Sequence, residues 1–211
     1  MTSPKELDDK KIDFYSLDIR DIKEKLFFHT IKRDHCDILK IGSLKEACIY
    51  CKYYNLSSQQ YGPLLERYII EKFKYIKNNA KDCNGDCSKN TRNFEIKISF
   101  GISQKSNSCK FNFVQLRLTQ YCESYILICY QLSPENIEEN LGELYIFKVP
   151  KEELKKIVLS HGGYAHGTIK VNGVMTSESI DNTKNEYAIR PSINDECWKK
   201  LMIFRVSEED L

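Results

Sequence analysis

One short stretch restricts the fold of this 211-residue chain more than any other. Tyr125-Ile126-Leu127-Ile128-Cys129-Tyr130 is apolar at every position. A strand with one wet face alternates apolar and polar residues, whereas an unbroken apolar run is typical of a strand covered on both faces. Further strands are predicted at Asn93–Phe100, Lys110–Leu118, Glu143–Val149 and Glu186–Pro191. Together with the helices described next, they predict an α/β fold with a central mixed β-sheet flanked by helices.

Helix signals stand before and after these strands. Ser43 and Glu46 form a capping-box pattern that starts a helix running to about Tyr54, and Ser57 or Ser58 caps the next, longer helix. Pro150 starts a third helix, Lys151–Leu159, which ends at Gly162-Gly163. Near the C-terminus, Trp198, Leu201, Ile203 and Phe204 are expected to form a closing core element, and Ser207–Leu211 a frayed acidic tail.

The strand at Asn93–Phe100 carries the most suggestive chemistry. Its apolar residues alternate with Glu95, Lys97 and Ser99, so one face is apolar and the other holds a carboxylate, an ammonium and a hydroxyl. Two residues along a strand span about 6.5 to 7 Å, close enough for Glu95 and Lys97 to act on one group. If Asp86 folds back beside Glu95, two acids can share a magnesium ion. The alternative is a surface strand whose charges are merely solvated.

Composition narrows the class of protein. The chain is long enough for one substantial core, and we expect an N-terminal arm at residues 1–42, a core domain at 43–160 and a C-terminal part of the same domain at 161–211. A net charge of +2 excludes a global polycation, so a basic binding surface has to be local. Neither a membrane span nor a signal peptide is found, and nine cysteines without a secretory signal fit free thiols in the cytoplasm.

Two alternatives concern smaller motifs. Cys48-x-x-Cys51 and Cys83-x-x-x-Cys87 have a spacing that a zinc site could use, although buried or incidental cysteines explain them better. The stretch His161–Lys170 crowds glycines, histidines, a tyrosine and a lysine together. Either it brings side chains to phosphates or base edges, or it is a helix C-cap followed by an ordinary hairpin at Asn172-Gly173.

The spacing of the charged residues resembles a known family. Asp86, eight intervening residues and then Glu95-Ile96-Lys97 resemble the signature of the PD-(D/E)xK nuclease superfamily, and the whole is similar to a type II restriction endonuclease. Glu66 on the preceding helix and Gln115 on the following strand match accessory positions of that family. The resemblance covers roughly Ser57 to Tyr130 and departs from the pattern at Gly85, where the family has proline. Asp82 is a rival to Asp86 as the first acid.

The resemblance implies a restriction-endonuclease-like core and an activity. The protein would be a Mg²⁺-dependent, sequence-specific endonuclease that hydrolyses double-stranded DNA to leave 5′-phosphates, with Mn²⁺ as a substitute metal. Asp86 and Glu95 would bind the metal and Lys97 would position or deprotonate the attacking water, with Glu66 and Gln115 as helpers. The expected DNA-contacting residues are Arg117, Tyr164, His166, Lys170 and Arg190.

The resemblance also implies partners. Members that cut palindromes commonly act as symmetric homodimers, and a cognate DNA methyltransferase belongs to the same kind of system. Three other functions stay open from the sequence. They are a non-catalytic DNA- or RNA-binding module on the same scaffold, a repair-type nuclease without a recognition sequence, and a zinc-stabilised interaction protein.

Overall fold

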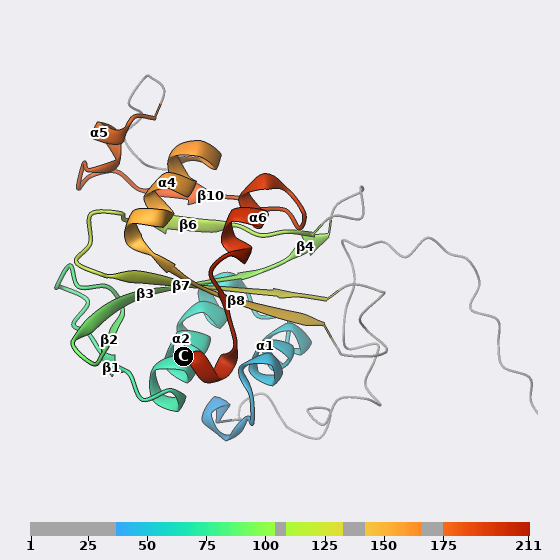
Figure 1. The fold of residues 1–211 in the computed structure, drawn as a ribbon. Coiled ribbons are helices and arrows are strands. Elements are labelled where there is room, and N and C mark those ends of the chain that lie inside the picture. The colour runs from blue at the N-terminus through green and yellow to red at the C-terminus, as the bar shows by residue number, and fades with distance from the viewer. Residues whose placement is uncertain (1–36, 104–108, 133–141, 166–174) are drawn as a thin grey trace, which may run out of the picture.

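A computed structural model describes residues 37–103, 109–132, 142–165 and 175–211 of the chain (Figure 1). The expected N-terminal arm lies outside these residues up to position 36, as do His166, Lys170 and the predicted Asn172-Gly173 turn.

The described part of the chain is built on a six-stranded sheet. Its spatial order is β1-β2-β3-β7-β8-β11, in which β3 and β7 run parallel and every other neighbouring pair is antiparallel. The prediction of a central mixed sheet is therefore confirmed. The strands are β1 (Ile76–Lys77), β2 (Cys87–Lys89), β3 (Arg92–Phe100), β7 (Ser124–Gln131), β8 (Glu143–Pro150) and β11 (Arg205–Val206).

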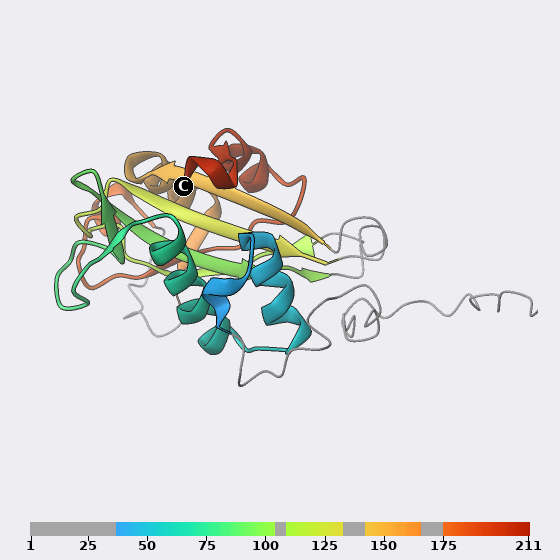
Figure 2. The same ribbon diagram turned by 90° about the horizontal axis from the view of Figure 1, so that it is seen from below.

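Helices cover both faces of this sheet, as Figures 1 and 2 show. α1 (Leu44–Tyr53) and α2 (Ser58–Lys72) pack on one face, and α4 (Lys151–His161) and α6 (Glu196–Met202) on the other. The predicted capping box at α1 is present, with the Ser43 hydroxyl accepting from the Glu46 N–H. Shorter helical turns are η4 (Ile38–Lys40), α5 (Ser177–Ile180) and η5 (Glu208–Asp210).

Two small sheets complete the fold. One has the order β6-β10-β9, from β6 (Phe113–Leu116), β10 (Tyr187–Ile189) and β9 (Gly162–Tyr164), and the other pairs β4 (Ile102–Ser103) with β5 (Cys109–Lys110). The prediction of one strand over Lys110–Leu118 in the central sheet is therefore wrong. Alternation indicates that a segment is extended, but it does not indicate which strand it pairs with.

A β-bulge interrupts β6. Leu116 pairs with Tyr187 and Phe113 with Ile189, so β6 has one residue more than β10 between these pairs. Gln115 takes a φ of +56°, a left-handed conformation that is uncommon outside glycine. Val114 and Gln115 consequently both face solvent.

Two hydrophobic cores lie on opposite faces of the central sheet. Phe94, Ile96, Ile126 and Ile128 pack against α1 and α2, whereas Tyr125, Leu127 and Cys129 pack against α4, α6 and β6. β7 is buried on both faces, as its unbroken apolar sequence predicts. β3 is also covered on both faces, so the expectation of one solvated polar face is wrong. The second sheet lies over that face, and the Asn112 N–H donates to the Ser99 hydroxyl at 2.8 Å.

The C-terminal segment differs from its prediction. Leu211 is buried, and its main-chain oxygen accepts from the Tyr75 hydroxyl and from Lys89 Nζ, both at 2.7 Å. The Glu208 carboxylate accepts from the Leu44 N–H at 2.7 Å. Ser207–Leu211 is thus docked, because its carboxylates cap backbone groups. Ile203, predicted to be in the core, is 76% exposed.

None of the helices in the described ranges is long and apolar enough to span a bilayer.

The pair Leu201 and Ile203 tests the described C-terminal packing. Leu201→Ala removes a fully buried side chain and is expected to lower the free energy of unfolding by about 2 to 5 kcal/mol. Ile203→Ala should change it by less than about 0.5 kcal/mol, because this side chain is already in solvent. Urea denaturation of both variants measures the difference. Equal losses would contradict the placement of α6.

Candidate active site

Strand β3 has an open edge next to the predicted site residues. β2 pairs with β3 only from Arg92 to Phe94, and no other described strand pairs with that edge beyond Phe94. Side chains take over part of the edge hydrogen bonding. Asp86 Oδ2 accepts from the Ile96 N–H at 2.8 Å, and the Tyr61 hydroxyl accepts from the Phe100 N–H at 3.5 Å. An open edge lets groups from other elements converge on β3.

Glu95 and Lys97 form the centre of the candidate site. Lys97 Nζ donates to Glu95 Oε1 at 2.6 Å, and the Glu95 side chain is only 5% exposed. Its second oxygen, Oε2, is buried and accepts no hydrogen bond from the described residues. Burial raises the pKa of Glu95 above its ordinary value even though the Lys97 charge lowers it, and the Asp86 charge adds to the rise. A buried carboxylate oxygen without a partner is costly and calls for a ligand.

Asp86 lies just before β2, at the end of the turn that contains Gly85. Its N–H donates to the Phe94 carbonyl at 2.9 Å, which fixes it beside β3. Gly85 has a φ of +74°, and a Cβ there would lie 2.6 Å from the Phe94 carbonyl oxygen. Proline is locked near −65°, so this chain cannot place the family's proline at Gly85. The rival Asp82 is exposed, and Asp86 is the aspartate whose charge acts on Glu95 and Glu66.

Glu66 reaches the same region from α2. Partial burial raises its pKa, the Asp86 charge raises it further, and Lys77 and Lys97 act in the opposite direction. Lys77 Nζ lies 3.6 Å from Glu66 Oε1. Three carboxylates and two ammonium groups therefore interact electrostatically beside the open edge of β3.

A groove of about 480 Å³ runs along this edge between α2 and β6. Glu66 lines it from α2, Lys97 from β3 and Gln115 from β6, so three of the predicted site residues share one surface. Tyr61 and Asn112 are among the other lining residues, and sequence reasoning did not single them out. Tyr61 stacks on Phe100 with ring centroids 4.0 Å apart, and no motif marks such a contact beforehand.

The predicted DNA-contacting residues are spread over the second sheet. Arg117 is exposed and pairs with Glu186 at 2.7 Å, and Arg190 is exposed just after β10. Tyr164 is half-buried on β9 with its ring 5.5 Å from that of Tyr187. The helix C-cap reading of the Gly-rich stretch is correct at its start, because α4 ends at Gly162, where a Cβ would lie 2.7 Å from the Val158 carbonyl oxygen.

Metal-binding groups were also sought among the described residues. No group of three or more His, Cys, Asp or Glu side chains there is arranged to hold a metal ion. The four cysteines of the zinc alternative have different surroundings, with Cys48, Cys51 and Cys87 buried and Cys83 exposed. Asp86 and Glu95 are two carboxylates, the number with which magnesium is often bound when waters and substrate phosphates complete its shell.

Comparison with known proteins gives no family for this chain. No protein-family model matches the sequence, and no curated protein matches it. Two solved structures match weakly: FMN-bound TdsC from Paenibacillus sp. A11-2, and TdsC in a complex with FMN and indole. Their TM-scores are 0.17 and 0.18 at 9% and 10% identity, and each match covers 69% of this chain and 36% of TdsC. Likenesses this low carry no argument about fold or function.

The buried carboxylate gives a pH-dependent prediction for Glu95→Gln. A raised pKa means that the folded state holds its proton more tightly than the unfolded state. The wild type therefore loses stability as pH rises from the unfolded value near 4.3 through the raised folded value. The variant lacks this loss, so its free energy of unfolding relative to wild type should increase with pH over that window.

Urea denaturation between pH 4 and 8 measures this trend. The attraction of Lys97 is already part of the Glu95 pKa, because it acts only on the charged carboxylate. Glu153→Gln removes an exposed carboxylate that pairs with Lys156 at 2.7 Å and serves as the control. A relative stability of Glu95→Gln that falls with pH would mean that Lys97 outweighs the cost of burial.

Proposed function

We propose that this protein is a magnesium-dependent nuclease that hydrolyses phosphodiester bonds in double-stranded DNA at specific sequences. The observation that carries the proposal is the convergence of Glu66, Asp86, Glu95 and Lys97 at the open edge of β3, with Glu95 Oε2 buried and without a partner. Structural ion pairs satisfy their buried atoms. An acidic cluster that leaves one unsatisfied suits a cation that arrives with the substrate.

The donor set fits magnesium. Asp86 and Glu95 would hold it through hard carboxylate oxygens. Burial, and to a smaller extent the Asp86 charge, raises the pKa of Glu95, and a bound cation would favour its charged form. When bound, magnesium lowers the pKa of a coordinated water and neutralises charge on a phosphate. Mn²⁺ accepts the same oxygen ligands and is the expected substitute.

Lys97, Glu66 and Gln115 would orient the attacking water and the phosphate. Lys97 Nζ can hold a water for attack or donate to the phosphate as negative charge develops, and its bond to Glu95 Oε1 fixes where it points. Glu66 faces Asp86 and Lys97 from α2 and is placed to orient a water or the lysine. The Gln115 side chain lines the opposite wall of the groove and can donate to a phosphate oxygen.

DNA as the substrate, sequence specificity and a symmetric homodimer rest on the resemblance to type II restriction endonucleases. The groove supports this choice because Glu66, Lys97 and Gln115 line it together, so that a phosphate could contact side chains from three elements. The exposed Arg117 directly follows β6, which forms one wall of this groove, and the exposed Arg190 directly follows β10, the strand paired with β6. A dimer would place two such grooves on the two strands of a palindrome.

Cleavage of plasmid and genomic DNA tests the proposal. Wild-type protein with Mg²⁺ or Mn²⁺ is expected to give discrete fragments with 5′-phosphate ends, and none in EDTA. Glu95→Gln and Lys97→Met should each lower the cleavage rate by about 10²-fold or more, because each removes a group next to the reacting phosphate. A gel and end-labelling measure both results.

The exposed pair Glu153 and Lys156 on α4 provides matched controls. Glu153→Gln and Lys156→Met make the same chemical changes away from the groove and should cleave like wild type. Equal loss in the controls, or cleavage that survives in Glu95→Gln, would contradict the assignment. DNA binding without cleavage under any metal would favour the non-catalytic module, and an even smear would favour a nuclease without a recognition sequence.

A further inference from the structure

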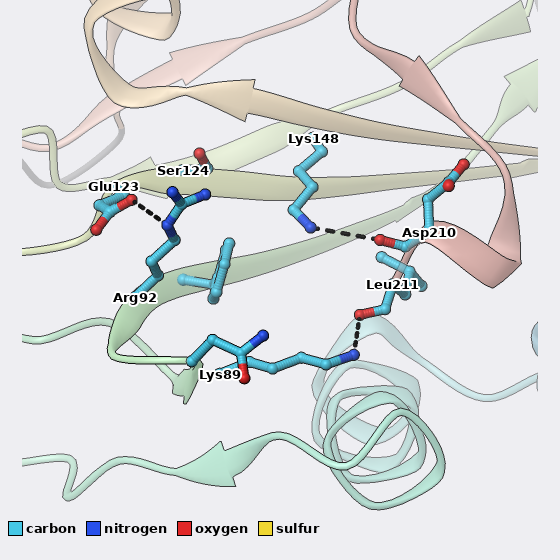
Figure 3. Close-up of a pocket in the computed structure, with 9 residues that line it drawn as sticks. Lys89, Arg92, Glu123, Ser124, Lys148, Asp210 and Leu211 are labelled. Carbon is cyan, nitrogen blue, oxygen red and sulfur yellow. Dashed lines mark hydrogen bonds and ion pairs between the residues drawn. The ribbon is translucent and has the colours of Figure 1, made fainter.

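A second cleft, of about 490 Å³, lies at the end of β3 away from the groove (Figure 3). Three cationic side chains line it: Lys89 from β2, Arg92 from β3 and Lys148 from β8. Ser124 and the ring of Phe94 form its floor, and Asp210 and Leu211 close one side. None of the three cations belongs to the groove that holds Lys97 and Gln115.

The pairing of β2 with β3 places two of these cations, Lys89 and Arg92, next to each other. Lys89 and Arg92 are directly opposite each other in the β2–β3 ladder. They flank a two-residue turn, Asn90-Thr91, whose φ angles of +51° and +65° are those of a type I′ hairpin, so the pairing is rigid. Like charges directly opposite in a ladder are destabilising. Such an arrangement needs a compensating anion.

Lys148 adds a third charge to this pair. Its Nζ lies 5.2 Å from the centre of the Phe94 ring. Burial and the Lys89 and Arg92 charges lower its pKa, and the Asp210 charge acts in the opposite direction. The charges of Lys89 and Arg92 therefore oppose the charge of Lys148. An anion bound between them would remove this repulsion.

Groups inside the cleft compensate the positive charges of Lys89, Arg92 and Lys148 only in part. Lys89 Nζ and Lys148 Nζ donate to the main-chain oxygens of Leu211 and Asp210, at 2.7 and 3.3 Å, as Figure 3 shows. The Asp210 carboxylate instead accepts from the Ser207 N–H and hydroxyl. Glu123 lies 3.4 Å from Arg92, but both side chains are more than half exposed. An exposed ion pair contributes little and exchanges readily for a stronger partner.

We propose that the cleft of Lys89, Arg92 and Lys148 binds a backbone phosphate of the DNA outside the cleavage groove. The assignment to DNA rests on the proposed function, and the chemistry of the cleft is that of a phosphate site, with three donors of positive charge around one opening. Arg92 precedes Glu95 by three residues, about 10 Å along β3. The first groove residue on β3 is Ile96, so the cleft lies before the groove along the strand.

This contact would set the path of the DNA. Arg92 and Glu95 project to opposite faces of the sheet, since three residues separate them on a strand. A duplex that contacts both sites would therefore lie across the β2–β3 turn and bend there. Contacts to a phosphate carry no sequence information, so the cleft holds the register of the DNA while other residues read the bases.

Metal-free binding measures the contact apart from cleavage. We would titrate a labelled 30-base-pair duplex with wild-type protein and with Arg92→Gln and Lys148→Gln in EDTA, following fluorescence anisotropy from 50 to 300 mM NaCl. Each variant is expected to raise Kd about five- to tenfold near 0.1 M salt and to lower the salt slope by about one, because one phosphate contact is lost. Lys148→Arg keeps the charge and should bind close to wild type.

Lys199→Gln on α6 is the control, because Lys199 also pairs with an exposed carboxylate, Glu196, at 2.6 Å. It should leave Kd and the salt slope unchanged. Unchanged binding by Arg92→Gln and Lys148→Gln, or no metal-free binding by wild type, would overturn the proposal. So would thermal stabilisation by inorganic phosphate that the variants lose while their DNA affinity stays the same, since the cleft would then hold free phosphate.

The two proposals fail separately. A wild-type protein that binds DNA through the cleft yet never cleaves it would refute the nuclease and leave the cleft standing. A nuclease whose Arg92→Gln and Lys148→Gln variants bind and cleave like wild type would refute the cleft alone.

Discussion

The burial of both faces of β3 is the constraint on which most of this structure depends. One face carries Phe94 and Ile96 and packs against α1 and α2 like any core strand. The other carries Glu95, Lys97 and Ser99, and burying it requires partners for each polar group. Ser99 accepts from the Asn112 N–H, and Glu95 pairs with Lys97. Among these three side chains, only Glu95 leaves a buried atom, Oε2, without a partner in the described residues.

The two candidate sites have opposite electrostatic character and lie at different positions along β3. Near its middle, burial and the charges of neighbouring carboxylates raise the pKa values of Glu66 and Glu95, an environment that favours a cation. At its start, three cations repel one another and favour an anion. A phosphodiester with its metal ion supplies both kinds of charge. The net charge of +2 hides this division, because opposite local charges cancel in the sum.

Local sequence patterns predicted individual helices and strands well, but they did not predict which strands pair with each other. The unbroken apolar run of β7, the capping box of α1 and the Pro150 start of α4 each follow from residues close in sequence, and all three are present. Alternation could not tell that β6 joins a second sheet, because that depends on a strand seventy residues away. The spacing of Asp86, Glu95 and Lys97 marked these residues as a candidate site, and Lys97 lines the groove. The cleft was missed because Lys148 meets Lys89 and Arg92 only through the sheet.

The parallel pairing of β3 with β7 has a consequence for folding kinetics. β2–β3 is a tight hairpin, but β3 and β7 pair across 30 positions of sequence, for example Glu95 with Tyr125. The hairpin can form within microseconds, whereas closing the longer loop costs entropy before any contact compensates it. Non-local pairing of this kind slows folding. Glu95 therefore acquires its buried surroundings late, in the same step that joins the two halves of the sheet.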